Sequence, residues 1–382
     1  MTTQRRTRLV FGAMTGTSID GIDTAAVSVR GRGLRARVTL CGQAHAPLGA
    51  LTERLRSAQR QFPLTAGEFV ALARDLAIAH IAPLRQLAET HGAPDLIALH
   101  GQTLFHQPPD SLQLIDASVV AHAFGCSVIS NLRAVDLAAG GQGAPITPLS
   151  DWMSFRAKKS WRVVINLGGF CNATVIPPEP IERSDWIGSV RGFDLCLCNQ
   201  LLDHLARTRA NAPFDADGRI AAAGKVHAAP LTALRAHLDQ QRRAGRSLGT
   251  ADEILAAGSS ALADLNPSDA LATATRGICE TIAAGILEPC PAFASGASVK
   301  VLVAGGGAKN PCLMHELSRA FGKRVHTTDS VGIPAEARET IAMAVLGTLA
   351  ADGVSITLPA VTHRGATQVL DGCLLRANPA RP

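Results

Sequence analysis

Tyrosine is absent from this chain of 382 residues, and aromatic side chains make up only 4% of it. Proteins that bind single-stranded nucleic acid stack the bases on aromatic side chains, so the composition speaks against that class. No run of about 18 apolar residues occurs, which is close to the length that a transmembrane helix requires. We therefore expect neither a nucleic-acid partner nor a membrane partner.

The spacings typical of metal and redox sites are missing as well. The one close cysteine pair, Cys196 and Cys198, lacks the two-residue spacer of a zinc knuckle or a thioredoxin site. His100 and His106 do not have the i, i+4 spacing of a helical zinc site. The basic N-terminal segment leads into an apolar run too short for a secretory signal. We expect reduced thiols, no metal site of Cys and His, and a cytoplasmic protein.

Apolar residues and glycine are plentiful instead. Hydrophobic residues make up 47% of the chain, and its 35 glycines are spread along the whole length, which is typical of a globular α/β protein. The length predicts two domains. The net charge of +6 comes mostly from scattered arginines, and it suits an anionic small substrate as well as it suits nucleic acid.

Three segments combine an apolar run with a glycine-rich turn, namely residues 9–26, 163–176 and 299–314. In the first two, a second apolar run follows at once, which predicts a hairpin. In the third, Pro311 and apolar residues at helical spacing follow the turn, which predicts strand, turn and helix. Elsewhere the pattern predicts helices over 69–90, 200–210, 271–287 and 340–349, strands over 96–99 and 127–130, a loop over 140–145, and a weakly patterned tail from 352.

The first turn is rich in groups that bind phosphate. Hydroxyls at Thr15, Thr17 and Ser18 add donors beside the backbone N–H groups, and two glycines let the backbone turn sharply and approach a ligand. Asp20 or Asp23 is suited to hold a water on Mg²⁺, which prefers oxygen ligands. The turn is not a Walker A loop. An exposed hairpin with ordinary Asp-Gly capping remains the alternative.

The order of the three turns adds information that no single turn carries. Hairpin, second hairpin and strand–glycine–helix turn resemble the scheme of actin-like ATPases, in which two hairpins grip the phosphates and the later turn packs on adenosine. The resemblance implies an α/β, two-lobed actin-like (ribonuclease H-like) ATPase fold with a central cleft between the lobes. Lobe I would span residues 1–160 with a returning segment 336–382, and lobe II would span 161–335.

Distinctive motifs make the resemblance more specific, and the chain is similar to the anhydro-N-acetylmuramic acid kinase family from about residue 9 to the tail. The motifs lie at Gly12 to Asp23, His100 to Thr103 with His106, Asp136 to Pro145, Asn166 to Gly169 with Asn172 and Thr174, Gly305 to Gly307 with Asn310 and Pro311, and Pro334 to Glu339. The family implies an ATP- and Mg²⁺-dependent kinase of cell-wall recycling. It opens the 1,6-anhydro bond of its sugar and phosphorylates O6, giving N-acetylmuramic acid 6-phosphate.

The resemblance also implies site residues. Nucleotide binding falls to Gly16, Thr17, Ser18, Ile19, Asp20, Gly21, Ile22, Asp23, Gly168, Gly169, Gly305, Gly306, Gly307 and Asn310. Sugar binding falls to His100, Asn131, Asp136, Gln142 and Glu339, with Arg133 beside them. Four of these sugar-site residues have a structural alternative: a satisfied structural histidine for His100, a loop cap for Asp136, a surface charge for Arg133 and an exposed helix-start acid for Glu339.

The family's catalytic base lies in a Gly-Phe-Asp-Thr-Gly-Pro-Gly-Asn segment, which here reads Gly192-Phe-Asp-Leu-Cys-Leu-Cys-Asn199. Asp194 and Asn199 match, and the four residues between them do not. The resemblance assigns the base to Asp194, which would take a proton from the attacking water. The alternative from the residues alone is that Leu195 to Cys198 extend the next helix backward with Asp194 as its N-cap.

Two other functions remain open from the sequence. One is a kinase of another anhydrosugar, such as levoglucosan. The other is a catalytically impaired nucleotide-binding sensor, which the loss of Gly-Pro-Gly after Asp194 would explain. We also expect a homodimer.

Overall fold

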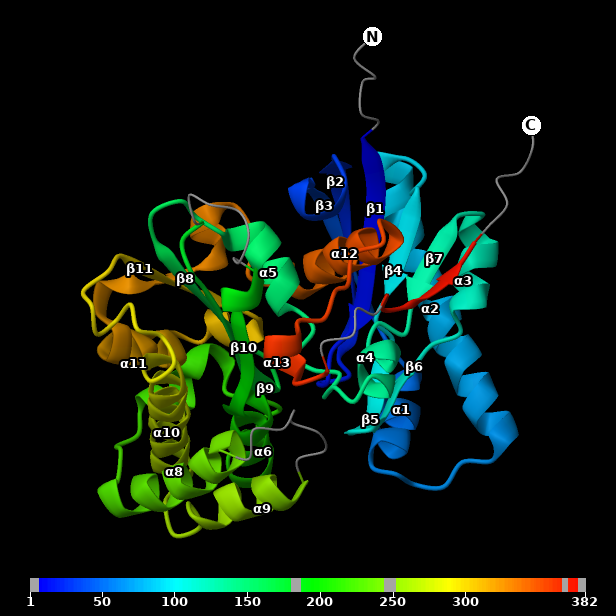
Figure 1. The fold of residues 1–382 in the computed structure, drawn as a ribbon. Coiled ribbons are helices and arrows are strands. Elements are labelled where there is room, and N and C mark those ends of the chain that lie inside the picture. The colour runs from blue at the N-terminus through cyan, green and yellow to red at the C-terminus, as the bar shows by residue number, and fades with distance from the viewer. Residues whose placement is uncertain (1–6, 180–186, 244–251, 366–369, 377–382) are drawn as a thin grey trace. The chain divides into compact units, whose positions relative to one another are not determined.

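The computed structural model describes residues 7–179, 187–243, 252–365 and 370–376. The chain divides into two compact units, of which unit 1 comprises Met1–Ser154 and Ala337–Pro382 and unit 2 comprises Phe155–Glu336 (Figure 1). From the sequence, the crossing is expected near residue 160 and the return near 336.

Unit 1 is built on a six-stranded sheet in the order β13-β7-β4-β1-β2-β3. Strands β1, β2 and β3 are antiparallel neighbours, and β4 and β7 run parallel to β1. The predicted first hairpin and the predicted strands over 96–99 and 127–130 are therefore confirmed. The strands are β1 (Arg8–Thr15), β2 (Gly21–Arg30), β3 (Arg37–Pro47), β4 (Leu96–Leu99), β7 (Ser127–Ser130) and β13 (Cys373–Leu375), with a separate pair β5 (Gln102–Gln107) and β6 (Asp110–Leu114).

Helices cover both faces of this sheet. Alternate residues of a strand point to opposite faces, and Phe11 and Ala13 pack in one apolar cluster with Ala77 and Leu84 of α2. Gly12, between them, faces α12. The helices of unit 1 are α1 (Leu51–Gln59), α2 (Ala66–His91), α3 (Ala117–Phe124), α4 (Ala134–Ala138), α5 (Pro148–Phe155), α12 (Arg338–Ala351) and α13 (Pro359–Thr362).

Two glycines let α12 lie close to the sheet, beside β1 in Figure 1. A Cβ at Gly12 would meet the carbonyl oxygen of Thr340 at 2.1 Å, and one at Gly347 would meet the Cβ of Ala98 at 2.5 Å. Real side chains do not tolerate such distances, so both positions require glycine for close packing. This contact fixes the first turn of α12 beside the strand that leads into the first glycine-rich turn.

Unit 2 repeats the strand order of unit 1. Its five-stranded sheet has the order β10-β9-β8-β11-β12. Strands β8, β9 and β10 are antiparallel neighbours, and β11 and β12 run parallel to β8. Unit 1 has the same arrangement in β3-β2-β1-β4-β7. The repeat is that of the ribonuclease H-like unit, so the predicted α/β ribonuclease H-like fold of the two units is confirmed. The strands are β8 (Trp161–Leu167), β9 (Phe170–Ile176), β10 (Arg191–Leu197), β11 (Val299–Ala304) and β12 (Val325–Thr327).

The core of unit 2 lies between one face of its sheet and its helices. Val163, Ile165 and Leu167 of β8 meet Leu234 and Ile278 from two of these helices in a single apolar cluster. The helices are α6 (Asn199–Arg209), α7 (Arg219–Ala222), α8 (Ala228–Arg243), α9 (Asp252–Ser260), α10 (Pro267–Leu287) and α11 (Pro311–Phe321). Helix α10 is long and apolar enough to cross a membrane, but 72% of its most apolar window is buried inside the protein, as expected of a core helix.

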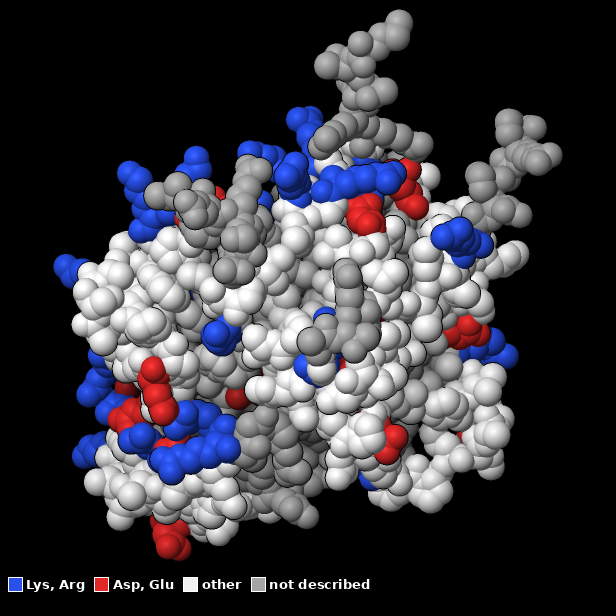
Figure 2. All heavy atoms as spheres, in the orientation of Figure 1, with Lys and Arg blue, Asp and Glu red and all other residues white. Residues whose placement is uncertain are grey.

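Most predicted helices are confirmed within a few residues, as α2, α6, α10 and α12 show. The tail is more regular than its sequence suggests, because α13 and β13 form there and β13 pairs with β7. On the face shown in Figure 2, lysine and arginine side chains form several separate groups instead of one continuous stripe.

Candidate functional site

The predicted site residues of unit 1 gather at one edge of its sheet. The first turn follows β1, His100 follows β4 and Asn131 follows β7, and these three strands are parallel neighbours. The carboxyl ends of parallel strands meet at the same edge, where open α/β sheets bind their ligands. Asn131 is exposed and has a positive φ of 54°, a conformation that asparagine tolerates.

The first turn is shaped by isoleucine, not by glycine as the sequence analysis predicts. Ile19 has a φ of 52°, an unfavourable value for a β-branched residue, whereas Gly16 and Gly21 are outside the left-handed region. The fully buried side chain of Ile19 packs with Leu48 and Leu55, and this burial holds the strained backbone in place. Ile19 therefore contributes to a ligand only through its backbone.

Apart from the buried Thr15, the polar side chains of the first turn are exposed, half-buried or paired with a neighbouring strand. Ser18 and Asp20 are exposed and Thr17 is half-buried. Asp23 accepts a hydrogen bond of 2.8 Å from the ring of His45, its direct partner across β2 and β3. The same ring lies over Gly21, where a Cβ would meet it at 2.1 Å, so a side chain at this position would displace the exposed His45 ring from Asp23.

Glu339 lies near Asp23 at the start of α12. Burial raises the pKa of the Glu339 carboxyl, Asp23 and Asp151 raise it further, and Arg338 and Arg133 lower it. These influences bring Glu339, Asp23 and Arg133 into one electrostatic neighbourhood. Glu339 is partly buried, which speaks against the exposed helix-start alternative.

We expect Glu339→Gln to raise the melting temperature at neutral pH. When the pKa of a carboxyl is raised in the folded state, the protein loses stability as pH rises above 4.5, the pKa of that carboxyl in the unfolded chain. Above this pH the unfolded carboxyl is ionised, and folding requires burying its charge. The gain should therefore disappear as pH falls below that value. Differential scanning calorimetry between pH 4 and 8 measures it, with Glu89→Gln on exposed helix surface as control. A lower melting temperature for Glu339→Gln at pH 7 would contradict the pKa shift.

His100 holds an arginine in place. Arg133 donates hydrogen bonds of 3.2 and 2.9 Å to Nε2 of His100, while Nδ1 of His100 donates to the carbonyl of Gly101 at 2.9 Å. Burial, with the charge of Arg133, lowers the pKa of His100 to about 3, so the ring is neutral and accepts at Nε2. Both ring nitrogens are occupied. The alternative that His100 is a satisfied structural histidine is thus favoured, and His100 orients Arg133.

Asp136 supports the glycine-rich loop that follows it. Its fully buried carboxylate accepts hydrogen bonds from the backbone N–H of Gly143 at 2.8 Å and from Thr362 at 2.7 Å, and it pairs with Arg364 at 3.3 Å. The loop-cap alternative is therefore favoured for Asp136. Gln142 is half-buried in the same loop, and its sugar-binding role remains a prediction.

In unit 2, three predicted segments come together around the second turn. The backbone N–H groups of Cys198 and Asn199 donate to the carbonyls of Gly169 and Gly168, at 2.9 and 3.1 Å. The side-chain amide of Asn199 donates to the carbonyl of Leu167 at 3.0 Å. The second turn and the start of α6 are thus joined by main-chain and side-chain hydrogen bonds.

The glycine triplet packs against the same turn. A Cβ at Gly307 would lie 2.6 Å from the Cβ of Leu167, and one at Gly305 would lie 2.8 Å from the carbonyl oxygen of that residue. Gly305 also has a φ of 83°, which favours glycine. The helix predicted after this triplet is confirmed by α11. Asn310 is its N-cap, because its Oδ1 accepts from the backbone N–H groups of Cys312 and Leu313.

Asp194 lies within strand β10 and not at the start of a helix. The N-cap of α6 is Cys198, which makes no side-chain cap hydrogen bond, so the alternative that Asp194 caps this helix is wrong. Phe193 and Leu195 on either side of Asp194 pack in the core, which places the half-buried Asp194 on the opposite face. The carboxylate is thus on the face of the sheet opposite this apolar cluster.

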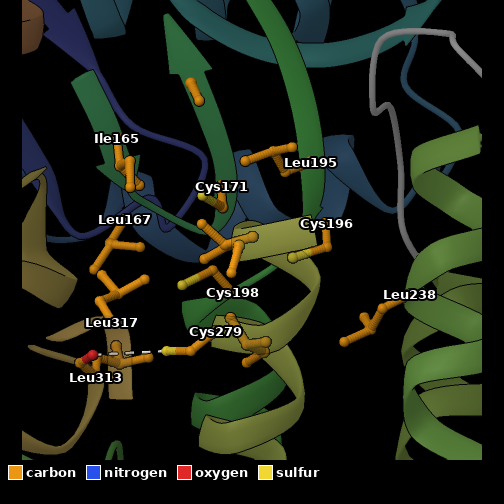
Figure 3. Packing of buried hydrophobic residues seen from close by; sticks show 14 of the residues in the cluster. Ile165, Leu167, Cys171, Leu195, Cys196, Cys198, Leu238, Cys279, Leu313 and Leu317 are labelled. Atoms are coloured by element: carbon orange, nitrogen blue, oxygen red, sulfur yellow. Dashed lines mark hydrogen bonds between the residues drawn. The ribbon is translucent and has the colours of Figure 1, made fainter. Parts of the chain in front are cut away.

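The residues after Asp194 fill the core behind it. Figure 3 shows Leu195, Cys196 and Cys198 among Cys171 and Cys279. A bulge between Asp194 and Cys196 allows both Leu195 and Cys196 to be buried. Burial raises the pKa of the Cys196 thiol well above its usual range and that of Cys198 to about 12, so these thiols are unreactive packing groups.

Two members of the site cannot be recognised from the sequence. Cross-strand partners share a face of the sheet, and the partners run from Asp194 to Asn172 and from Asn172 to Asn166. We call these three residues the polar row. Both asparagines belong to a family-like motif, but their alignment with Asp194 depends on strand register, which the sequence does not display.

Comparisons with known proteins agree on one family. The family model described as "Anhydro-N-acetylmuramic acid kinase" matches residues 8–375. Proteins of that name are 33% identical in Synechococcus elongatus (96% of this chain, 99% of that protein) and 36% identical in Bordetella parapertussis (95% of each). The one from Parasynechococcus marenigrum is 35% identical (97% of this chain, 100% of that protein).

Among solved structures, the chain is similar to a ROK family glucokinase from Streptomyces griseus. The identity is 15% and the TM-score 0.38, over 89% of this chain and 99% of that chain.

Proposed function

The chain belongs to the anhydro-N-acetylmuramic acid kinase family, and on that premise we propose that it opens 1,6-anhydro-N-acetylmuramic acid and phosphorylates O6 with ATP. The observation that carries the proposal is Asp194, whose carboxylate stands in the polar row of unit 2 beside the second turn and the glycine triplet. The product would be N-acetylmuramic acid 6-phosphate.

The proposed reaction needs one base and no separate acid. Water attacks the anomeric carbon and gives its proton to Asp194, while the bond from that carbon to O6 breaks. O6 forms its new bond to the γ-phosphorus of ATP, and ADP leaves. Because the phosphoryl group neutralises the departing oxygen, no side chain has to protonate it. Backbone N–H groups of the glycine-rich turns would stabilise the charge on the transferring group.

Arg133 and Glu339 suit the sugar. Arg133 is held by His100 and by the carbonyl of Gly143 at 2.7 Å, so it presents a fixed positive charge that fits the lactyl carboxylate. Glu339 would accept hydrogen bonds from sugar hydroxyls. Asn131 and Gln142 would add polar contacts at the same sheet edge.

Mg²⁺ would be held mainly by the phosphates. Among the described residues, no group of three or more His, Cys, Asp and Glu side chains is placed to hold a metal ion. Kinases commonly bind Mg²⁺ through substrate phosphates, waters and one or two carboxylates, and Asp23 or Asp20 offers such an oxygen. The ion would neutralise charge on the transferring phosphoryl group.

We expect ADP release from ATP only when 1,6-anhydro-N-acetylmuramic acid is present. A coupled pyruvate kinase–lactate dehydrogenase assay measures the rate, and mass spectrometry identifies the 6-phosphosugar. Levoglucosan, which lacks the N-acetyl and lactyl groups, is the matched control and should react poorly because it offers no carboxylate to Arg133. Faster turnover of levoglucosan would favour the other anhydrosugar kinase, and nucleotide binding without turnover of either sugar would favour the sensor.

The proposed setting follows from the substrates. ATP is available in the cytoplasm, and all nine cysteines are free in the structure, as expected of a reducing compartment. A homodimer, which sedimentation would test, remains part of the proposal.

A further inference from the structure

One polar atom in the polar row of unit 2 has no hydrogen-bond partner. Asn166 stands one residue before the end of β8, and the residue is only 3% exposed. Within the part of the chain that the structure describes, its buried Oδ1 accepts no hydrogen bond. A buried acceptor without a donor destabilises a protein relative to a satisfied one. Its presence therefore points to a donor that a ligand supplies.

The amide of Asn166 lies between the two glycine-rich turns of unit 2. A Cβ at Gly305 would lie 2.9 Å from Oδ1, and a Cβ at Gly168 would lie 3.3 Å from Nδ2. Its neighbours in β8, Ile165 and Leu167, point into the core, so Asn166 points away from it. The unpaired oxygen thus belongs to the face that carries Asp194.

The equivalent strand of unit 1 has a similar feature. Thr15 ends β1, the strand that occupies in unit 1 the place of β8 in unit 2, and its hydroxyl is also buried without a partner among the described residues. Unpaired buried hydroxyls also occur elsewhere, as at Thr281 in the core helix α10. What distinguishes Thr15 and Asn166 is their place beside a glycine-rich turn.

We propose that Asn166 is a nucleotide-site residue whose Oδ1 accepts a hydrogen bond from a water molecule carried in by Mg²⁺ and ATP. The phosphate oxygens of ATP are acceptors and cannot satisfy this atom, whereas Mg²⁺ bound to phosphates retains several waters, which are strong donors. A side-chain amide oxygen beside the phosphate turn suits such a water. The inference rests on the ATP use of the proposed function and assigns it a further residue.

Calorimetric titration with the ATP analogue AMPPNP in MgCl₂ tests the proposal without any sugar. Asn166→Ala removes the acceptor and should weaken binding about tenfold. Asn166→Asp keeps an acceptor oxygen in the same place and should bind within about threefold of the wild type. With EDTA in place of MgCl₂, Asn166→Asp should lose most of its affinity relative to wild type, because its carboxylate then faces the phosphates directly.

The matched control is Thr281→Val, which removes a partnerless buried hydroxyl from the same unit away from the turns, and it should leave the affinity unchanged. Wild-type affinity for Asn166→Ala in MgCl₂ would overturn the proposal, as would Asn166→Asp binding as weakly as Asn166→Ala. If Asn166→Ala does not fold, the isosteric Asn166→Asp provides the test. An equal loss of AMPPNP affinity with and without Mg²⁺ would then overturn the proposal. A chain that passes this test but phosphorylates no sugar refutes only the proposed reaction, and a wild type that does not bind AMPPNP refutes this inference.

Discussion

Asp194→Asn should bind ATP as tightly as the wild type and yet lose about 10²- to 10⁴-fold in sugar-dependent ADP release, the range expected when a general base is removed. The substitution keeps the shape of the side chain and its place in β10, so the phosphate turns stay intact. Only the proton acceptor is lost. The rate comes from the coupled assay under saturating substrates, and the ATP affinity comes from calorimetry.

Asp217→Asn is the matched control, because Asp217 lies on unit 2 in an exposed pair with Arg219. It should keep full turnover. Near-full turnover of Asp194→Asn would exclude Asp194 as the base. A parallel loss of ATP binding would instead indicate that the substitution disturbs the second turn, which is hydrogen-bonded to the residues that follow β10.

Asp151→Ala should lower the free energy of unfolding by about 3–5 kcal/mol, because it leaves the guanidinium of Arg338 buried without its carboxylate. Both side chains are almost completely buried, at 2% and 1% exposure, and Nε of Arg338 donates to Oδ1 of Asp151 at 2.9 Å. Arg338 also donates to Thr147 at 2.9 Å. The pair therefore fixes the start of α12, where Glu339 lies, to α5. Urea unfolding monitored by circular dichroism measures the change.

Asp75→Ala provides the comparison, because Asp75 pairs with Arg54 and Arg74 on the surface of unit 1. Such exposed pairs contribute about 0–1 kcal/mol. The joint replacement Asp151→Leu with Arg338→Met should be milder than Asp151→Ala, since no charge stays buried. A loss below about 1 kcal/mol for Asp151→Ala would mean that water reaches Arg338 once the carboxylate is gone.

The sequence predicts those features that local pattern determines. An apolar run, a glycine-rich turn and a second apolar run give the hairpins β1–β2 and β8–β9, and Asn310-Pro311 marks the start of α11. Edge strand β3 escapes prediction because it alternates between partly buried and exposed residues and contains few strong strand formers. The short β13 depends on its pairing with β7, a contact between distant parts of the chain.

The site itself is predicted less completely, because much of it depends on tertiary contacts. Glycine is the expected residue for a left-handed turn position. Ile19 nevertheless takes that conformation, because burial of its side chain in the core offsets the backbone strain. Asp136 looks like a sugar ligand until its contacts with Gly143 and Thr362 are seen. Asn166 and Asn172 join Asp194 only through strand register. None of these relations has a signature in a local window of sequence.

The apolar segment behind Asp194 packs against a residue that lies far away in the sequence. The Leu195 side chain lies against Gly285 on α10, where a Cβ would meet its terminal methyl group at 2.5 Å. A larger residue at 285 would therefore force the Leu195 side chain to shift, or would require a smaller residue at 195. The residues that fit at positions 195 and 285 are thus coupled by packing volume, even though neither residue is part of the polar row.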